Sequence, residues 1–136
     1  MTSREPGPDK YQKASYHIII VDDDPLTAQC LADMLQKLGH SATAVHTPHG
    51  ALHHIHQVVP DVIVIDINLP GLDGLQICHY LRREPGTAHI PVIVISAHSK
   101  TAYKDAAKVA GANQYLVKPV MLADLEQALA QVTAGR

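Results

Sequence analysis

The 136-residue chain has no phenylalanine and no tryptophan, and apart from its histidines its only aromatic residues are five tyrosines. So few rings argue against a base-stacking nucleic-acid binder or a carbohydrate platform. No apolar run approaches the ~18 residues that cross a bilayer, so we expect no membrane contact. The balance of 11 basic and 13 acidic residues gives a net charge of −2, which implies no polybasic binding surface.

Cysteine is scarce as well. Cys30 and Cys78 fit no metal or redox spacing, and we expect both to be small buried hydrophobic residues. The first residues are polar and lack a hydrophobic signal core, which predicts a disordered leader over 1–15 and a cytoplasmic protein. Residues 16–136 are long enough to form one domain with a core of its own.

Within 16–136, short β-branched apolar runs alternate with segments whose apolar residues recur at helical spacing. Strands that are apolar at nearly every position are covered on both faces, as in a parallel sheet. We therefore predict a doubly wound (βα)5 α/β sandwich with a parallel five-stranded sheet. For its strand order we adopt 2-1-3-4-5, the flavodoxin-like order known from other doubly wound sheets. The predicted strands are 17–21, 41–45, 62–65, 91–95 and 114–117. Apolar positions expected in the first and last helices are Leu26, Cys30, Leu31, Met34, Leu35, Leu38, Leu122, Leu125, Ala128 and Leu129.

Polar residues follow four of these strands at the point where each strand ends. They are Asp22 and Asp23, then Asp66, Ser96 and Lys118. Right-handed crossovers bring these ends to one edge of the sheet, where ligands bind. Three carboxylates there repel one another unless a cation is present, and an all-oxygen site suits Mg²⁺. The pattern indicates a metal-assisted phosphoryl site with Asp66 as the nucleophile.

Taken singly, these residue types have ordinary structural roles. A lone aspartate at a strand end is most often a helix N-cap or a turn former. Asp24 is expected to cap the first helix, with Pro25 at its first position. We interpret residues 82–84, Arg-Arg-Glu, as a solvated helix end. The coincidence of polar residues at four strand ends is what favours a functional site.

Four segments of the chain carry a family resemblance, in order and with suitable spacing. They are IIVDDDP at 19–25, VIDINLPGLDG at 64–74, VISA at 94–97 and GANQYLVKP at 111–119. Together they resemble the motifs of response-regulator receiver domains, over about residues 16–134. The resemblance implies that Asp66 accepts a phosphoryl group from the phosphohistidine of a sensor kinase. It also implies Mg²⁺ as the cofactor, ligated directly by Asp23 and Asp66, through water by Asp22, and by the backbone carbonyl of Asn68.

The resemblance also assigns the remaining motif residues. Ser96 would hydrogen-bond the phosphoryl group once it has formed, and Lys118 would pair with it. Tyr115 matches the switch aromatic of the family, and the Lys118–Pro119 bond matches one that is cis in the family. Serine replaces the commoner threonine at 96, and Val120 stands where many members have phenylalanine.

Ten histidines are many for this length. His49, His53 and His56 fall on one face of the second helix, where three solvated histidines are favoured over a metal site. His98 lies two residues after the serine of the fourth strand, where its side chain would border the phosphoryl pocket. Together with Asn68 it would be placed to tune the attack of water on the aspartyl phosphate.

The predicted function is a phospho-acceptor switch of a two-component system that changes the face made by the fourth helix, fifth strand and fifth helix. Its partners would be a histidine kinase or a histidine phosphotransfer protein, and an output protein or domain. We expect a monomer or weak homodimer that is not an enzyme beyond its own phosphorylation and dephosphorylation. Two alternatives stay open: a receiver-like module that is never phosphorylated, and an aspartyl-phosphate hydrolase. The hydrolase is disfavoured because such enzymes usually carry a second aspartate where this chain has Asn68.

Overall fold

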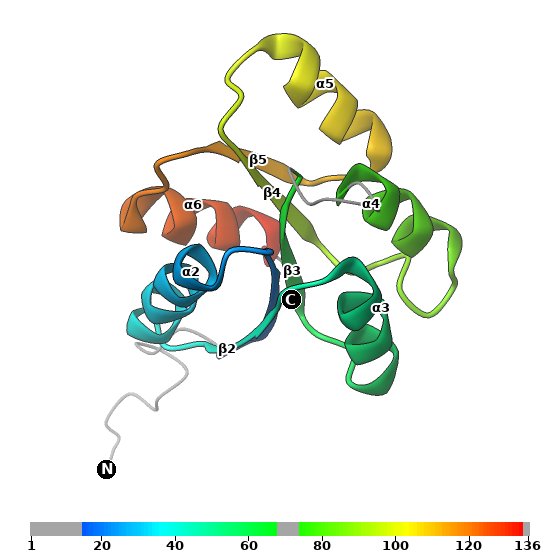
Figure 1. Ribbon diagram of the computed structural model, residues 1–136, viewed down its shortest axis with the longest axis horizontal. Coiled ribbons are helices and arrows are strands. Elements are labelled where there is room, and N and C mark those ends of the chain that lie inside the picture. The colour runs from blue at the N-terminus through cyan, green and yellow to red at the C-terminus, as the bar shows by residue number, and fades with distance from the viewer. Residues whose placement is uncertain (1–14, 68–73, 135–136) are drawn as a thin grey trace.

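A computed structural model describes residues 15–67 and 74–134. Its sheet has five parallel strands in the order β2-β1-β3-β4-β5, so the predicted doubly wound fold and strand order are confirmed (Figure 1). The strands are β1 (His17–Val21), β2 (Ser41–Val45), β3 (Val62–Asp66), β4 (Val92–Ser96) and β5 (Gln114–Val117).

Helices cover both faces of this sheet, as the apolar strands require (Figure 1). One face carries α2 (Pro25–Lys37) and α6 (Leu122–Val132), and the other carries α3 (Pro48–Gln57), α4 (Gly74–Arg83) and α5 (Thr101–Ala110). Among the residues described, no helix is both long enough and apolar enough to cross a bilayer.

The strands divide their side chains between two separate cores. In β1, Ile18 and Ile20 pack toward α2 and α6, while Ile19 and Val21 pack toward α3, α4 and α5. Successive side chains of a strand point to opposite faces of the sheet, and helices cover both faces, so all four residues are fully buried. The three central strands, β1, β3 and β4, therefore carry polar side chains only at their ends, whereas the partly buried β2 carries Thr43 at its middle.

Helix α2 begins as predicted. Asp24 is the N-cap, its carboxylate accepts from the backbone N–H of Leu26, and Pro25 occupies the first helical position. Burial of Cys78 is confirmed, but the expectation that Cys30 is buried is wrong, because Cys30 is exposed. The buried stripe of α2 is Ala28, Leu31, Ala32 and Leu35.

Two other apolar positions expected in these helices lie outside the buried stripes. Leu26 is 79% exposed and Leu122 is 40% exposed. Both stand in the first turn of their helices, and neither is among the buried residues of α2 or α6. Leu125, Ala128 and Leu129 are buried as predicted.

Arg82 corrects the interpretation of residues 82–84 as a solvated helix end. Its guanidinium donates to the carbonyls of Gly111, Ala88 and Ile90 and to Oδ1 of Asn113, at 2.7 to 3.2 Å. Burial lowers the pKa of Arg82 from its ordinary value. The side chain thus joins the end of α4 to the end of α5 and the start of β5, and satisfies carbonyls that the helix ends would leave unpaired.

Substitution of Gly111 tests this junction. Gly111 has φ +109°, and an added Cβ would lie 2.6 Å from Cγ of Arg82, a side chain that its hydrogen bonds hold in place. Gly111→Ala should lower the free energy of unfolding by roughly 2–3 kcal/mol, measured by urea denaturation. Gly39→Ala is the matched control, because Gly39 has φ +94° but no atom within 4 Å of the added Cβ. It should cost only about 1 kcal/mol, the strain alone; equal losses would show that Arg82 yields.

Candidate functional site

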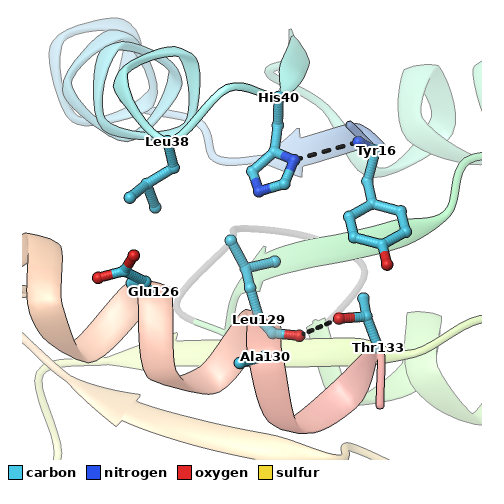
Figure 2. Close-up of a pocket in the computed structure, with 7 residues that line it drawn as sticks. All are labelled: Tyr16, Leu38, His40, Glu126, Leu129, Ala130 and Thr133. Atoms are coloured by element: carbon cyan, nitrogen blue, oxygen red, sulfur yellow. Dashed lines mark hydrogen bonds between the residues drawn. The ribbon is translucent and has the colours of Figure 1, made fainter. Parts of the chain in front are cut away.

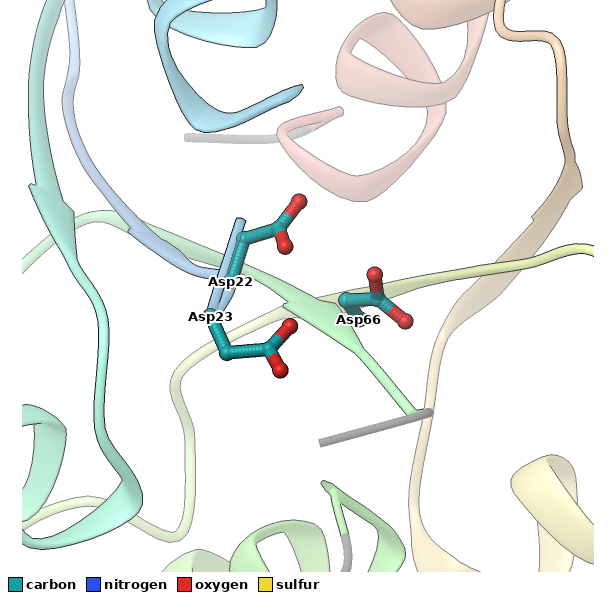
Figure 3. Close-up of side chains that lie close together, drawn as sticks. All are labelled: Asp22, Asp23 and Asp66. Carbon is teal, nitrogen blue, oxygen red and sulfur yellow. The ribbon is translucent and has the colours of Figure 1, made fainter. Parts of the chain in front are cut away.

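Three carboxylates meet at the carboxyl edge of the sheet. Asp22 and Asp23 directly follow β1, Asp66 is the last residue of β3, and these two strands are neighbours. Each residue offers a carboxylate oxygen within 4.8 Å of the others. Figure 3 shows the three side chains close together. Asp22 is fully buried, Asp66 is 6% exposed and Asp23 is exposed. The structure therefore brings together the acidic residues that the sequence predicted to share one edge.

Asp22 has the most confined carboxylate of the three. Its Oδ1 accepts from the backbone N–H of Asp24 at 3.0 Å, whereas its buried Oδ2 has no hydrogen-bond partner among the residues described. Burial is the main cause that raises the pKa of Asp22 above its ordinary value, and the charge of Asp66 adds to it. A buried anionic oxygen without a partner is costly, so this atom fits a site that takes a cation.

Hydrogen bonds to the end of β2 hold the backbone of Asp22 in place. The N–H of Asp22 donates to the carbonyl of Val45 at 3.0 Å, and Nδ1–H of His46 donates to the carbonyl of Asp22 at 3.0 Å. His46 was not singled out from the sequence. Its only signal there is that it directly follows a predicted strand, as the site residues do.

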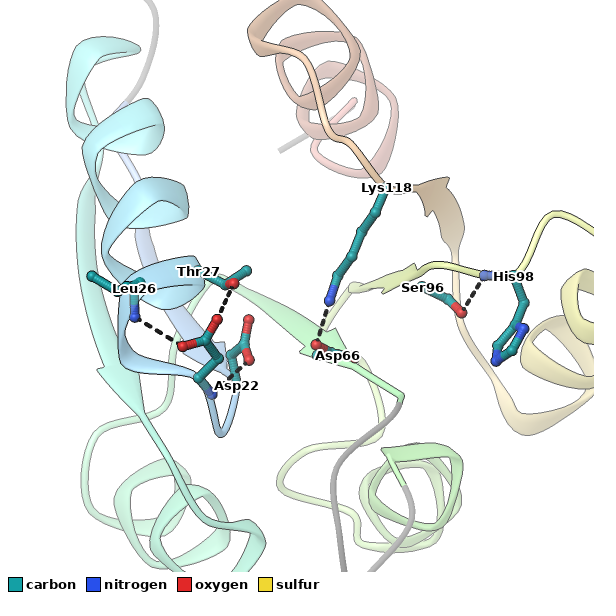
Figure 4. Close-up of polar contacts among 8 residues, drawn as sticks. Asp22, Leu26, Thr27, Asp66, Ser96, His98 and Lys118 are labelled. Atoms are coloured by element: carbon teal, nitrogen blue, oxygen red, sulfur yellow. Dashed lines mark hydrogen bonds and ion pairs between the residues drawn. The ribbon is translucent and has the colours of Figure 1, made fainter.

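Lys118 supplies positive charge to this acidic edge. Its Nζ lies 2.7 Å from Oδ2 of Asp66, so the residues predicted at the ends of the third and fifth strands form an ion pair (Figure 4). The side chain of Lys118 is 31% exposed, whereas that of Asp66 is 7% exposed. One cation thus faces a cluster of three carboxylates, and the excess negative charge suits a divalent metal with oxygen ligands.

Ser96 completes the edge at the end of β4 and is fully buried. Its Oγ accepts from the backbone N–H of His98 at 3.0 Å, which leaves the hydroxyl proton for another acceptor (Figure 4). The backbone N–H of Lys118 donates to the carbonyl of Ser96 at 2.8 Å, and the Lys118–Pro119 bond is cis, as the family resemblance implied. Tyr115 lies on β5, and its hydroxyl donates to the carbonyl of His98 at 2.7 Å.

Two other predicted features stand apart from this cluster. Asn68 lies outside the described residues, so its expected backbone ligand stays a prediction. His49, His53 and His56 are exposed on α3, and Nε2 of His56 is 2.8 Å from the hydroxyl of Tyr80. In the described part of the chain, the three aspartates form the one group of acidic, histidine or cysteine side chains with a metal-like arrangement.

Two apolar cavities lie outside the carboxylate cluster. One of about 400 Å³ borders Lys118 and is lined by α2 residues that include Cys30 and Met34. The other, of about 310 Å³, lies at the opposite edge of the sheet, between the end of α2 and α6 near the start of β1 (Figure 2). Tyr16 and His40 stand on one side of it, with the Tyr16 N–H donating to Nδ1 of His40 at 3.1 Å. Neither cavity contains the three carboxylates, so the polar chemistry is concentrated at the acidic edge itself.

Comparison with known proteins identifies the same pattern. The model of the response regulator receiver domain family matches residues 18–130. The chain is 36% identical over 118 residues to Protein PilH of Pseudomonas aeruginosa, covering 87% of this chain and 98% of that protein. Other curated relatives are longer, and the chain spans about half (47%) of their length.

Solved structures agree with the fold. The structure of a putative response regulator from Chloroflexus aurantiacus is 31% identical with a TM-score of 0.84, and the match covers 88% of this chain and 98% of that one. The receiver domain of the sensor histidine kinase PA1611 from Pseudomonas aeruginosa is 29% identical with a TM-score of 0.79, covering 87% and 97%. That receiver domain has a magnesium ion coordinated in its active site cleft.

The raised pKa of Asp22 gives a prediction about stability. Because the folded state holds the Asp22 proton more tightly than the unfolded state, Asp22 destabilises the metal-free fold increasingly as pH rises through its folded pKa. In EDTA at pH 7, Asp22→Asn should therefore raise the free energy of unfolding by about 1 kcal/mol. The difference between wild type and variant should shrink as the pH falls below that pKa, measured by urea denaturation at each pH.

Asp23→Asn is the matched control, because Asp23 shares the crowding of charge but is exposed. It should stabilise the metal-free protein less than Asp22→Asn does. Mg²⁺ affinity should follow a different order. In a titration with Mg²⁺, Asp23→Asn should weaken the affinity at least as much as Asp22→Asn does. A metal-free Asp22→Asn protein less stable than wild type would contradict the picture of a strained, buried charge.

Proposed function

Since this chain belongs to the family of response regulator receiver domains, it is a two-component signalling domain, and we propose that Asp66 is its phospho-acceptor. The observation that supports this most directly is the 2.7 Å contact of Lys118 with Asp66, beside two further carboxylates. A nucleophilic oxygen, a cation to meet an incoming phosphoryl group and a set of metal ligands occur at one edge. The donor is the phosphohistidine of a sensor histidine kinase or of a histidine phosphotransfer protein, and the chain acts in the cytoplasm.

The transfer uses the carboxylate of Asp66 directly. One of its oxygens attacks phosphorus, an O–P bond forms as the N–P bond of phosphohistidine breaks, and the leaving imidazole nitrogen keeps the electron pair. Mg²⁺, when bound, neutralises charge on the phosphoryl oxygens. Asp23 and Asp66 would hold it directly and Asp22 through water, together with the expected backbone carbonyl of Asn68. Lys118 steadies the negative charge from the side opposite the acidic pair.

The product changes the contacts of the edge. A phosphoryl group places up to two negative charges and three acceptor oxygens on Asp66, so Lys118 gains a stronger partner than the carboxylate it holds now. The buried hydroxyl of Ser96 supplies a second donor. The loop after β4 then adopts a second arrangement, and Tyr115 changes the face made by α5, β5 and α6 that an output protein or domain recognises.

Two rival functions make different predictions. A receiver-like module that is never phosphorylated would bind its partner equally well with or without a phosphoryl donor. An aspartyl-phosphate hydrolase would turn over added substrate many times. Receiver domains are signalling switches and not enzymes in the ordinary sense, which favours the switch over the hydrolase.

Labelling of Asp66 tests the proposed acceptor. With acetyl phosphate and Mg²⁺, the wild-type chain should gain the mass of one phosphoryl group in intact-mass spectrometry. Asp66→Asn should abolish the gain, because the nucleophilic oxygen is lost. Asp105→Asn, an exposed aspartate on α5, is the control and should be labelled like wild type. Labelling of Asp66→Asn at the wild-type level would place the acceptor elsewhere.

Lys118 and Ser96 should separate the chemistry from the switch. Lys118→Ala and Ser96→Ala should still accept some phosphoryl group, because the nucleophile and the acidic cluster remain. Beryllofluoride, a phosphoryl mimic, should shift the amide resonances of residues 97–120 strongly in wild type and weakly in both variants. Lys37→Ala, at the end of α2, should respond like wild type. A full response in both variants would mean that other residues couple Asp66 to this face.

A further inference from the structure

His98 contacts three parts of the molecule that the proposed switch has to connect. Its backbone N–H donates to Oγ of Ser96 at 3.0 Å (Figure 4). Its carbonyl accepts from the hydroxyl of Tyr115 at 2.7 Å. Its imidazole stacks on the ring of Tyr103, with centroids 4.3 Å apart and planes inclined by 15°. One residue thus links the site hydroxyl, the aromatic residue of β5 and the first turn of α5.

The first half of α5 has few other attachments. The buried residues of the helix are Ala107 and Ala110, both in its second half, while residues 101–106 are exposed. Lys100, the N-cap, makes no side-chain capping bond. Within the described part of the chain, no side chain of residues 101–106 makes a hydrogen bond or an ion pair. The stack of Tyr103 on His98 is therefore the side-chain contact that fixes this half of the helix to the site loop.

We propose that His98 is a positioning residue that transmits the state of Ser96 to the first half of α5 through its stack on Tyr103. The proposal rests on the proposed function, in which the hydroxyl of Ser96 turns to a phosphoryl group on Asp66. When that hydroxyl moves, the N–H of His98 that donates to it is displaced, and the imidazole carries the ring of Tyr103 with it. Tyr103 is 41% exposed, so its displacement alters a surface that a partner can touch.

The side chain of His98 has a role distinct from that of its backbone. Any residue at 98 can provide the N–H and carbonyl that bond Ser96 and Tyr115, so these two contacts survive substitution. The ring stack depends on an aromatic side chain at both 98 and 103. Stacked rings of this kind change an equilibrium roughly 2- to 12-fold, enough to bias a switch without deciding whether the site is phosphorylated. Lys118 is the cation that pairs with Asp66, so we expect acceptance of the phosphoryl group to depend little on the His98 ring.

Two variants with conservative partners test the link in the full chain. His98→Ala and Tyr103→Ala remove the stack, whereas His98→Phe and Tyr103→Phe keep two stacked rings. With Mg²⁺ and beryllofluoride, wild type and both Phe variants should shift the amide resonances of residues 101–106. Both Ala variants should lose most of that shift while keeping the changes at Asp66 and Ser96. Their beryllofluoride affinity should stay within about 2- to 12-fold of wild type, the range of a lost stack.

The outcomes separate this inference from the proposed function. No response of the wild-type protein to beryllofluoride would contradict the phospho-acceptor itself. A wild-type response that persists in His98→Ala and Tyr103→Ala would overturn the role of the stack alone. A His98→Ala protein whose α5 shifts are intact but whose acetyl-phosphate label decays at a new rate would assign His98 to the attack of water, and would also overturn it. Thermal unfolding shows whether each variant folds. If one Ala variant does not fold, the Ala variant at the other ring of the stack provides the test.

Discussion

Negative charge is crowded at the edge of an otherwise apolar sheet, and the remaining polar features of the molecule are arranged around that crowding. Asp22, Asp23 and Asp66 offer oxygens within 4.8 Å of one another, and Lys118 reaches only one of them. The buried Oδ2 of Asp22 has no protein partner among the residues described. Such a cluster is stable only when something positive compensates it, so binding a cation and relieving the fold are the same event.

The sheet makes this concentration of charge possible. Its three central strands are buried on both faces, so their polar side chains appear where the strands end, and parallel strands in a doubly wound sheet end at the same edge. Residues separated by 52 positions, such as Asp66 and Lys118, therefore meet at 2.7 Å. The two cores on opposite faces hold these ends in register, while the site itself contributes little to packing.

Much of this was predictable from the sequence because strands and their ends are local features. Apolar runs that stop abruptly at Asp22, Asp66 and Lys118 identify both the element and the site. Side-chain packing across elements is not local, and it was predicted less well. The phase of α2 relative to the sheet decided that Cys30 is exposed, and the partners of Arg82 come from loops 6 to 31 residues away. The stack of His98 on Tyr103 likewise depends on how the β4–α5 loop turns, which no short pattern encodes.

Arg82 fixes one end of α5 more firmly than the other. The guanidinium donates to the carbonyl of Gly111 at the C-terminal end of the helix. The N-terminal end, at Lys100, has no side-chain cap, so we expect the helix to pivot about its C-terminal end. A ten-residue helix is about 15 Å long, so a tilt about Gly111 displaces the first turn most and the last turn least. Val109 is 81% exposed and lies close to Gly111, so its surface changes little when the helix tilts. A partner that binds α5 at Val109 would bind the phosphorylated and unphosphorylated states alike, whereas a partner that binds the first turn would distinguish them.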